Sequence, residues 1–198
     1  MSKEYLLAVK NLSCERNYKL IFNNLSFKLE PGRIILVNGN NGSGKTSLLL
    51  CIAGVLPYKG SVKIQKQYDD KIGYVGHKNA LNEADTINDY LTHWKKIYDY
   101  KDDFNYIINY FNFEKYLETP IRLLSFGQKK KLSFSRLQMI KSKVWLLDEP
   151  ISGLDKKAKY LILNLIMEHV KYGGGVVATS HQNLKFSKVK NIMSIKIG

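Results

Sequence analysis

The chain has 198 residues, a formal net charge of +14 and two cysteines. This length suggests one domain, or one compact domain with a sub-lobe, and it allows a core that needs no disulfide or metal to hold it. No apolar run approaches the ~20 residues that span a bilayer, so a membrane role would have to come from a partner. Cys14 and Cys51 without a signal or transit sequence suggest a reducing compartment.

The positive charge comes almost entirely from lysine, because the chain has only four arginines: Arg16, Arg33, Arg122 and Arg136. Arginine is the residue favoured for bidentate contacts to bases and phosphates. We therefore interpret the charge as a solvated, lysine-rich surface that could lie near anionic lipid, and we expect no direct contact with nucleic acid.

The N-terminal part of the chain predicts antiparallel strands. Residues 5–37 alternate apolar and polar positions, with turn signals at Asn23-Asn24 and Pro31-Gly32. Residues 34–37 are continuously apolar, as in a fully buried strand, and residues 47–53 are apolar enough for a buried helix. Further strands are expected within residues 60–76.

The pattern becomes helical from Thr86 to about Glu118, where Tyr90, Trp94 and Tyr98 share one helix face. We expect a helical sub-lobe at about residues 78–135, inserted in a single domain that covers residues 1–198. A strand at 144–147, a helix at about 156–172 and a strand at 175–179 follow. The fold class is thus α/β.

The segment between the strand at 34–37 and the following helix matches the P-loop pattern. It comprises Gly39, Asn40, Asn41, Gly42, Ser43, Gly44, Lys45 and Thr46, followed by Ser47. Glycines let successive backbone N–H groups turn toward one anion, and the helix adds its positive N-terminal end. Lys45 can reach the β- and γ-phosphates, and the Thr46 hydroxyl can ligate Mg²⁺. The sequence therefore predicts a site for ATP and Mg²⁺.

A second apolar strand ends in two carboxylates. Residues 144–147 deliver Asp148 to the edge where α/β sheets bind ligands, and there Asp148 can hold the metal ion. Glu149 is the expected general base, or polariser, for the attacking water.

Three further motifs resemble those of ABC ATPases. Residues 124–128 (LSFGQ) resemble the signature motif, residues 152–155 (SGLD) resemble the D-loop, and residues 178–181 (ATSH) resemble the strand end that carries the switch histidine. The resemblance covers nearly the whole chain. It implies a P-loop fold with an antiparallel β subdomain and an inserted helical subdomain.

The same resemblance implies a homodimer in which two chains meet head to tail around two ATP molecules. Ser125 and Gly127, with Gln128 beside them, would contact the γ-phosphate held by the other copy. His181 would hold the γ-phosphate or the water, and Asp155 would couple the two sites.

The match to the family pattern is least direct at three positions. Phe126 replaces the usual small residue of the signature. His77 stands where a glutamine is expected, either as a ligand of Mg²⁺ or water or as a loop residue. Tyr18 precedes Lys45 by the interval expected of an aromatic residue that stacks on adenine, with packing at the N-terminus as the alternative.

Local strings also resemble the ATP-binding subunits of the haem exporter complex of cytochrome c biogenesis. They include residues 12–16 (LSCER), 74–78 (YVGHK) and 173–182 (GGGVVATSHQ). This resemblance implies integral membrane partners, and a peripheral place on the cytoplasmic face of a bacterial inner membrane or on the matrix side of a mitochondrial one. It also implies ATP-driven release of a haem-loaded chaperone. The alternatives are the ATPase of a drug or polysaccharide exporter, or a soluble ABC ATPase associated with nucleic acid.

Overall fold

The computed structural model describes residues 4–65, 71–180 and 192–197. The chain divides into two compact units. The first comprises Met1–His77, Ser142–Pro150 and Asn164–Gly198, and the second comprises Lys78–Lys141 and Ile151–Leu163. The expected sub-lobe at 78–135 falls within the second unit. Within the described ranges, no helix combines the length and apolar character needed to cross a bilayer.

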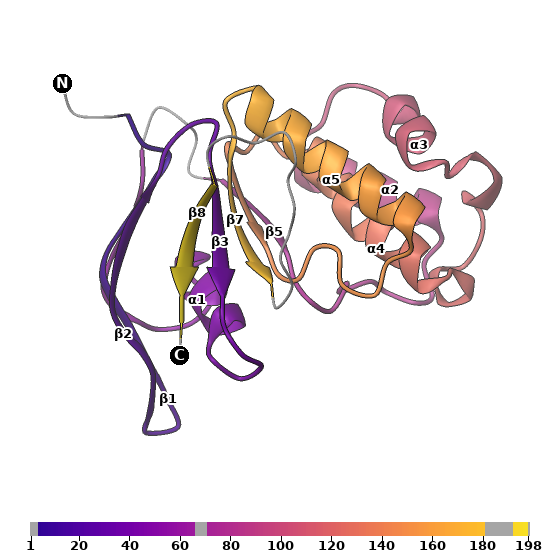
Figure 1. Ribbon diagram of the computed structural model, residues 1–198. Coiled ribbons are helices and arrows are strands. Elements are labelled where there is room, and N and C mark those ends of the chain that lie inside the picture. Colours follow the sequence, from indigo (N-terminus) through magenta and orange to yellow (C-terminus); the bar gives the residue numbers. More distant parts are fainter. Residues whose placement is uncertain (1–3, 66–70, 181–191, 198) are drawn as a thin grey trace. The chain divides into compact units, whose positions relative to one another are not determined.

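An antiparallel sheet begins the first unit (Figure 1). Its strands are β1 (Leu7–Arg16), β2 (Lys19–Leu29) and β4 (Lys59–Ile64), in the order β2-β1-β4. Register pairs such as Val9↔Phe27 and Val9↔Val62 put apolar side chains on one face. The predicted antiparallel strands are thereby confirmed.

The turn between β1 and β2 differs from the prediction. It lies at Asn17 and Tyr18, whose φ angles are 50° and 58°. The predicted turn at Asn23-Asn24 is wrong, because both residues lie inside β2. Asn24 has a φ of 53°, and its N–H donates to Ser13 Oγ at 2.9 Å, so the strand absorbs the local twist as an irregularity in register.

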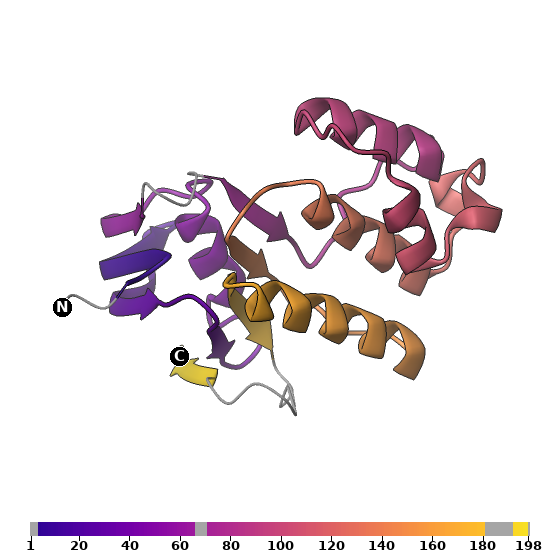
Figure 2. The same cartoon turned by 90° about the horizontal axis from the view of Figure 1, so that it is seen from above.

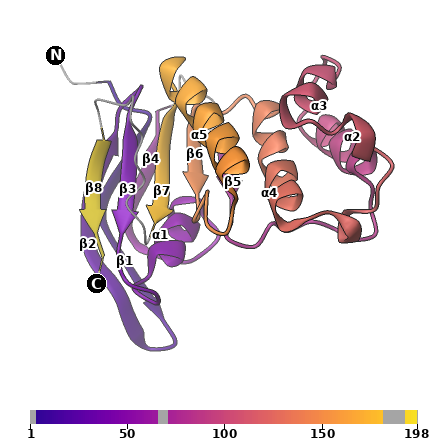
Figure 3. The same cartoon turned by 45° about the vertical axis from the view of Figure 1, so that its right-hand side comes forward.

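A parallel sheet forms the other layer of the first unit (Figure 3). Its strand order is β5-β6-β7-β3-β8. The strands are β3 (Ile34–Asn38), β5 (Ile72–Val75), β6 (Val144–Leu147), β7 (Gly175–Ser180) and β8 (Ile192–Lys196). Every residue of β6 and β7 is buried, as the continuous apolar runs predict. Because neighbouring strands are parallel, their carboxyl ends meet at one edge, and this edge positions the site.

Helix α1 (Lys45–Ile52) fills the space between the two sheets. Its residues Leu48, Leu49 and Ile52 belong to one apolar core together with residues of β1, β2, β3 and β6. Burying α1 against two sheets fixes the direction of its N-terminus, where the P-loop ends.

The second unit is helical (Figure 2). Its elements are α2 (Ile87–Ile97), α3 (Asn105–Phe111), α4 (Phe126–Ser135), the 3₁₀ turns Glu114–Tyr116, Ile121–Leu123 and Arg136–Gln138, and the first half of α5 (Lys156–Lys171). Leu91, Ile107, Phe111, Phe113 and Leu132 are fully buried in it. Helix α2 begins with a capping box, in which Thr86 and Asp89 exchange side-chain and backbone hydrogen bonds.

Candidate nucleotide-binding site

The P-loop connects β3 to α1 and depends on glycine at specific points. Gly42 and Gly44 have φ angles of 81° and 98°, which L side chains rarely adopt. A Cβ on Gly44 would also overlap Ile21 Cγ2 from β2. The loop can therefore turn its backbone amides inward and start α1 only with glycine at position 44.

Lys45 is the first residue of α1, and its side chain turns back onto this loop. Its Nζ donates to the carbonyl oxygens of Gly39 at 2.8 Å and Asn40 at 2.9 Å, and the residue is buried. The hydroxyl of Ser43 is also buried and has no hydrogen-bond partner among the described residues. A cation and an unpaired hydroxyl in a turn of backbone amides suit the oxygens of a phosphate chain.

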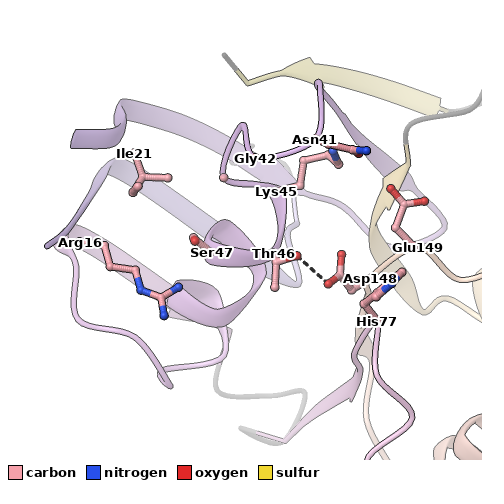
Figure 4. A pocket seen from close by; sticks show the side chains of 11 residues that line it. Arg16, Ile21, Asn41, Gly42, Lys45, Thr46, Ser47, His77, Asp148 and Glu149 are labelled. Carbon is pink, nitrogen blue, oxygen red and sulfur yellow. Dashed lines mark hydrogen bonds between the residues drawn. The ribbon is translucent and has the colours of Figure 1, made fainter. Parts of the chain in front are cut away.

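Asp148 follows β6 and is held by two hydroxyl groups, of which Figure 4 shows that of Thr46. The Thr46 hydroxyl donates to its Oδ2 at 2.8 Å, and the Thr179 hydroxyl donates to its Oδ1 at 2.6 Å. Asp148 is 1% exposed, so these hydrogen bonds offset the cost of burying a carboxylate. Hydroxyl and carboxylate oxygens at this distance form a donor set of the kind that Mg²⁺ prefers.

Glu149 leaves the strand in another direction. Its φ of 49° is left-handed, and its N–H donates to Thr179 Oγ1 at 3.0 Å. Figure 4 shows its carboxylate apart from that of Asp148. The change in backbone direction separates the two carboxylates, so they can serve different tasks.

These groups surround a cavity of about 560 Å³. Its lining residues are Arg16, Ile21, Asn41, Gly42, Gly44, Lys45, Thr46, Ser47, His77, Asp148 and Glu149. In Figure 4, Arg16 and Ile21 flank the P-loop on one side, and His77, Asp148 and Glu149 lie on the other. The volume and the arrangement suit an elongated ligand whose phosphates lie on the P-loop.

The structure therefore brings His77 to the predicted site but not Tyr18. Tyr18 is fully exposed in the β1–β2 turn. Arg16 and Ile21 line the side of the cavity where Tyr18 was expected to contact the adenine base. His181 lies outside the described residues.

The second unit holds the signature residues around a different cavity. It measures about 500 Å³ and is lined by Asn112, Ser125, Gly127, Gln128, Lys131, Asp155, Lys157, Ala158 and Leu161. Ser125 caps α4: its Oγ accepts from the Gln128 N–H at 3.2 Å, and its N–H donates to Gln128 Oε1 at 2.8 Å. A Cβ on Gly127 would meet only Ala158 Cβ at 4.0 Å, so Gly127 has open space before it.

Two lysines and one aspartate give this cavity its charge. Lys131 donates to the Phe111 carbonyl oxygen at 2.7 Å, and burial lowers its pKa, while Asp155 and Glu114 act to raise it. Asp155 Oδ1 accepts from the Ala158 N–H at 2.7 Å and thereby caps α5. Two capped helix N-termini and two lysines make the cavity attractive to an anion.

Sequence reasoning missed Thr179 and Arg16 as members of the first site. Thr179 carries a detectable signal, since it lies next to last in a buried strand and two residues before the predicted histidine. Arg16 carries none, because its place depends on where the β1–β2 turn falls.

A phosphate-binding loop between a buried strand and a helix, with a hydroxyl-bound aspartate at the end of a neighbouring parallel strand, defines the class of P-loop nucleotide hydrolases. A family profile described as "ABC transporter" matches residues 22–152. The chain therefore belongs to the ABC transporter family and is an ATP-binding, ATP-hydrolysing subunit of it.

Individual relatives and solved structures agree with this assignment. The chain is 33% identical to "Cytochrome c biogenesis ATP-binding export protein CcmA" of Reclinomonas americana, over 95% of this chain and 90% of that one. It is 35% identical to the protein of the same name from Wolbachia pipientis wMel, over 90% of each chain, and 34% identical to that of Legionella pneumophila strain Lens, over 92% and 96%.

Among solved structures, the fold is similar to "Structure of ATP binding subunit of ABC transporter". The TM-score is 0.86 at 20% identity, over 97% of this chain and 88% of that one. An ATP-binding cassette of an ABC transporter in its ADP conformation gives a TM-score of 0.79 at 19% identity, over 99% and 90% of the two chains. At these identities the structures establish the fold alone.

Proposed function

We propose that this chain is the ATPase subunit of the haem exporter complex of cytochrome c biogenesis. The observation that carries the proposal is the agreement in name of the relatives above, at 33–35% identity over nearly the full length of both chains. His77 supports it, because a histidine at this point is what the resemblance to that subfamily implies, and its side chain lines the nucleotide cavity.

In this proposal ATP and Mg²⁺ bind in the cavity of the first unit. Lys45 and the P-loop amides hold the phosphates, and Thr46 and Asp148 hold the metal ion. Mg²⁺ would supply charge neutralisation on the β- and γ-phosphate oxygens. Thr179 keeps Asp148 oriented and at the same time fixes the backbone of Glu149.

Glu149 then accepts a proton from the attacking water, or orients that water. His77 lies on the same side of the cavity and would contact Mg²⁺ or the attacking water. His181 would contact the γ-phosphate, as the family pattern implies.

The base of the nucleotide would lie against Arg16 and Ile21. A guanidinium plane can stack on a purine face in the way an aromatic ring does, and an aliphatic side chain covers the other part of the wall. We expect Arg16→Ala to raise the KM for ATP, and Tyr18→Ala to leave it unchanged because Arg16 lines the nucleotide cavity and Tyr18 does not. Steady-state ATPase kinetics of both variants would decide which residue contacts the base.

Two copies of the chain would complete each site. The cavity around Ser125 and Gly127 is open and electropositive, which suits a γ-phosphate presented by a second copy. Asp155, which lines the same cavity, would couple the two sites. The dimer would dock on integral membrane subunits, at the cytoplasmic face of a bacterial inner membrane or the matrix side of a mitochondrial one, and drive the release of haem-loaded chaperone.

The test is genetic and biochemical. Deletion of the gene should abolish haem attachment to c-type cytochromes, and the wild-type gene but not a Lys45→Ala version should restore it. A tagged Glu149→Gln chain extracted from membranes should bring down integral membrane proteins. Normal haem attachment in the deletion strain would favour a drug or polysaccharide exporter, and recovery of nucleic acid instead of membrane proteins would contradict the transporter assignment.

A further inference from the structure

Phe126 stands at the first turn of α4, directly after the capping residue Ser125. Although it is apolar, 54% of its surface is exposed. Its ring lies against Gly153, a residue of the turn that leads into α5. Both residues belong to the second unit, so this contact lies within one compact body.

The fit between Phe126 and Gly153 is close. A Cβ built on Gly153 would lie 2.9 Å from Phe126 Cε1, and its next two neighbours, at 3.5 and 3.6 Å, are atoms of the same ring. Gly153 also has a φ of 71°, which disfavours any side chain. The ring therefore occupies the space in front of Gly153, and a side chain at position 153 would require the ring to move.

The turn at 151–155 is anchored at its end, where Asp155 Oδ1 accepts from the Ala158 N–H at 2.7 Å, and it is held less firmly in its middle. Its backbone bond, from the Leu154 N–H to the Ile151 oxygen, is 3.5 Å long and therefore weak. Leu154 is buried and anchors the inner side of the turn. The Phe126 ring covers the outer side, one residue away from Gly127.

We propose that Phe126 is a positioning residue that sets Asp155 relative to Ser125 and Gly127. The proposal rests on the head-to-tail dimer described above, in which these three residues face the nucleotide of the second copy. Because Asp155 directly follows Leu154 in this turn, a shift of the turn would change the position of Asp155 in the cavity that Gly127 also lines. Phe126 thus replaces the usual small residue of the signature without closing the cavity, because its ring turns toward Gly153.

The experiment compares Phe126→Ala, Phe126→Tyr and an exposed aromatic control, Tyr160→Ala, in the full chain. Tyr160 is 69% exposed and does not line the cavity. We expect Phe126→Ala to lower kcat for ATP hydrolysis about tenfold, because a small displacement of groups that position a substrate can slow the reaction by factors of this order. The Kd for a fluorescent ATP analogue should not change, since Phe126 does not line the P-loop cavity. Phe126→Tyr and Tyr160→Ala should keep the wild-type kcat.

A double-mutant cycle tests the contact itself. Gly153→Ala should lower kcat in the wild-type background, and Phe126→Ala should remove part of that loss by making room for the methyl group. The proposal is overturned if Phe126→Ala retains wild-type kcat, if Gly153→Ala costs the same factor in both backgrounds, or if kcat, nucleotide affinity and Tm fall together. The dimer is tested separately. A Glu149→Gln chain that stays monomeric with ATP would contradict the proposed dimer, whatever the kcat values of the Phe126 variants are.

Discussion

The cavity of the first unit and the cavity of the second unit hold their polar groups in different ways. In the first, Thr46, Thr179 and Asp148 bond to one another across strands and a helix far apart in sequence. In the second, Ser125 and Gln128 bond to each other within one helix turn, and Asp155 caps its own helix in the same local way. The network of the first cavity thus joins several elements of the tertiary fold, whereas the capping groups of the second are held by local bonds. A change in the first should therefore disturb several elements at once, whereas the loss of stability from a capping change in the second should not exceed that of one helix cap.

The largest effect is expected from removing the Glu149 carboxylate. Glu149→Gln keeps the size and the backbone bond to Thr179, but it cannot accept a proton. We expect kcat to fall by roughly 10²- to 10⁴-fold, the range for loss of a general base, with ATP binding retained. Single-turnover hydrolysis and equilibrium binding measure the two quantities. A wild-type rate of ATP hydrolysis in this variant would show that Glu149 is not the general base.

Thr179→Val should affect both chemistry and stability. The substitution keeps the shape but leaves Asp148 Oδ1 and the Glu149 N–H without the Thr179 hydroxyl as partner. Losing partners in a buried network costs about 1–3 kcal/mol of unfolding free energy. Urea unfolding and ATPase assays should both report the loss, and Thr179→Ser, which restores the hydroxyl, should recover both. Normal activity in the Thr179→Val variant would show that the network is not needed.

The first unit also contains a pH-dependent contribution to stability. His169 stacks on Trp145 at 3.7 Å, and burial lowers its pKa to about 4. The unfolded chain protonates this histidine near pH 6.5 and the folded chain does not, so stability falls as the pH drops from 6.5 toward 4. Between pH 7 and pH 5 the loss should be about 2 kcal/mol. Unfolding curves at both pH values should show a smaller difference for His169→Gln, and an equal difference would exclude His169 as the cause.

The smallest effect concerns the second cavity and has a matched control. Ser125→Ala and Thr86→Ala each remove the capping side chain of a helix, α4 and α2 respectively. Each should cost about 1 kcal/mol of unfolding free energy. Only Ser125→Ala should also lower ATPase activity, because Thr86 does not line either cavity. Equal activity in the two variants would mean that Ser125 serves the helix alone.

The same contrast explains what could be predicted from sequence. The P-loop and the strand before Asp148 were predictable because their chemistry follows from contiguous residues, and β3, β6, β7, α1 and α5 agree with the expected ranges. The hairpin turn was misplaced because Asn24 tolerates a left-handed backbone inside β2, so its turn signal was misleading. Once that turn lies at Asn17 and Tyr18, Arg16 faces the cavity and Tyr18 does not.

Contacts between distant segments escaped the sequence analysis for a physical reason. The role of Thr179 depends on β7 pairing with β6, which no local pattern specifies. The contact of Phe126 with Gly153 depends likewise on the packing of α4 against the turn before α5. Strand β8 was not predicted at all, since four of its five residues are exposed and its pattern is weak.

The central claim is that each chain holds two incomplete half-sites that combine between copies. Gly127→Asp tests it directly, because among the described residues a Cβ at position 127 meets only Ala158 Cβ at 4.0 Å, and an acidic residue suits the first turn of α4. In a Glu149→Gln background, light scattering with ATP should give twice the monomer mass, and adding Gly127→Asp should leave an ATP-bound monomer. A monomer in the first case, or a dimer in the second, would contradict the account.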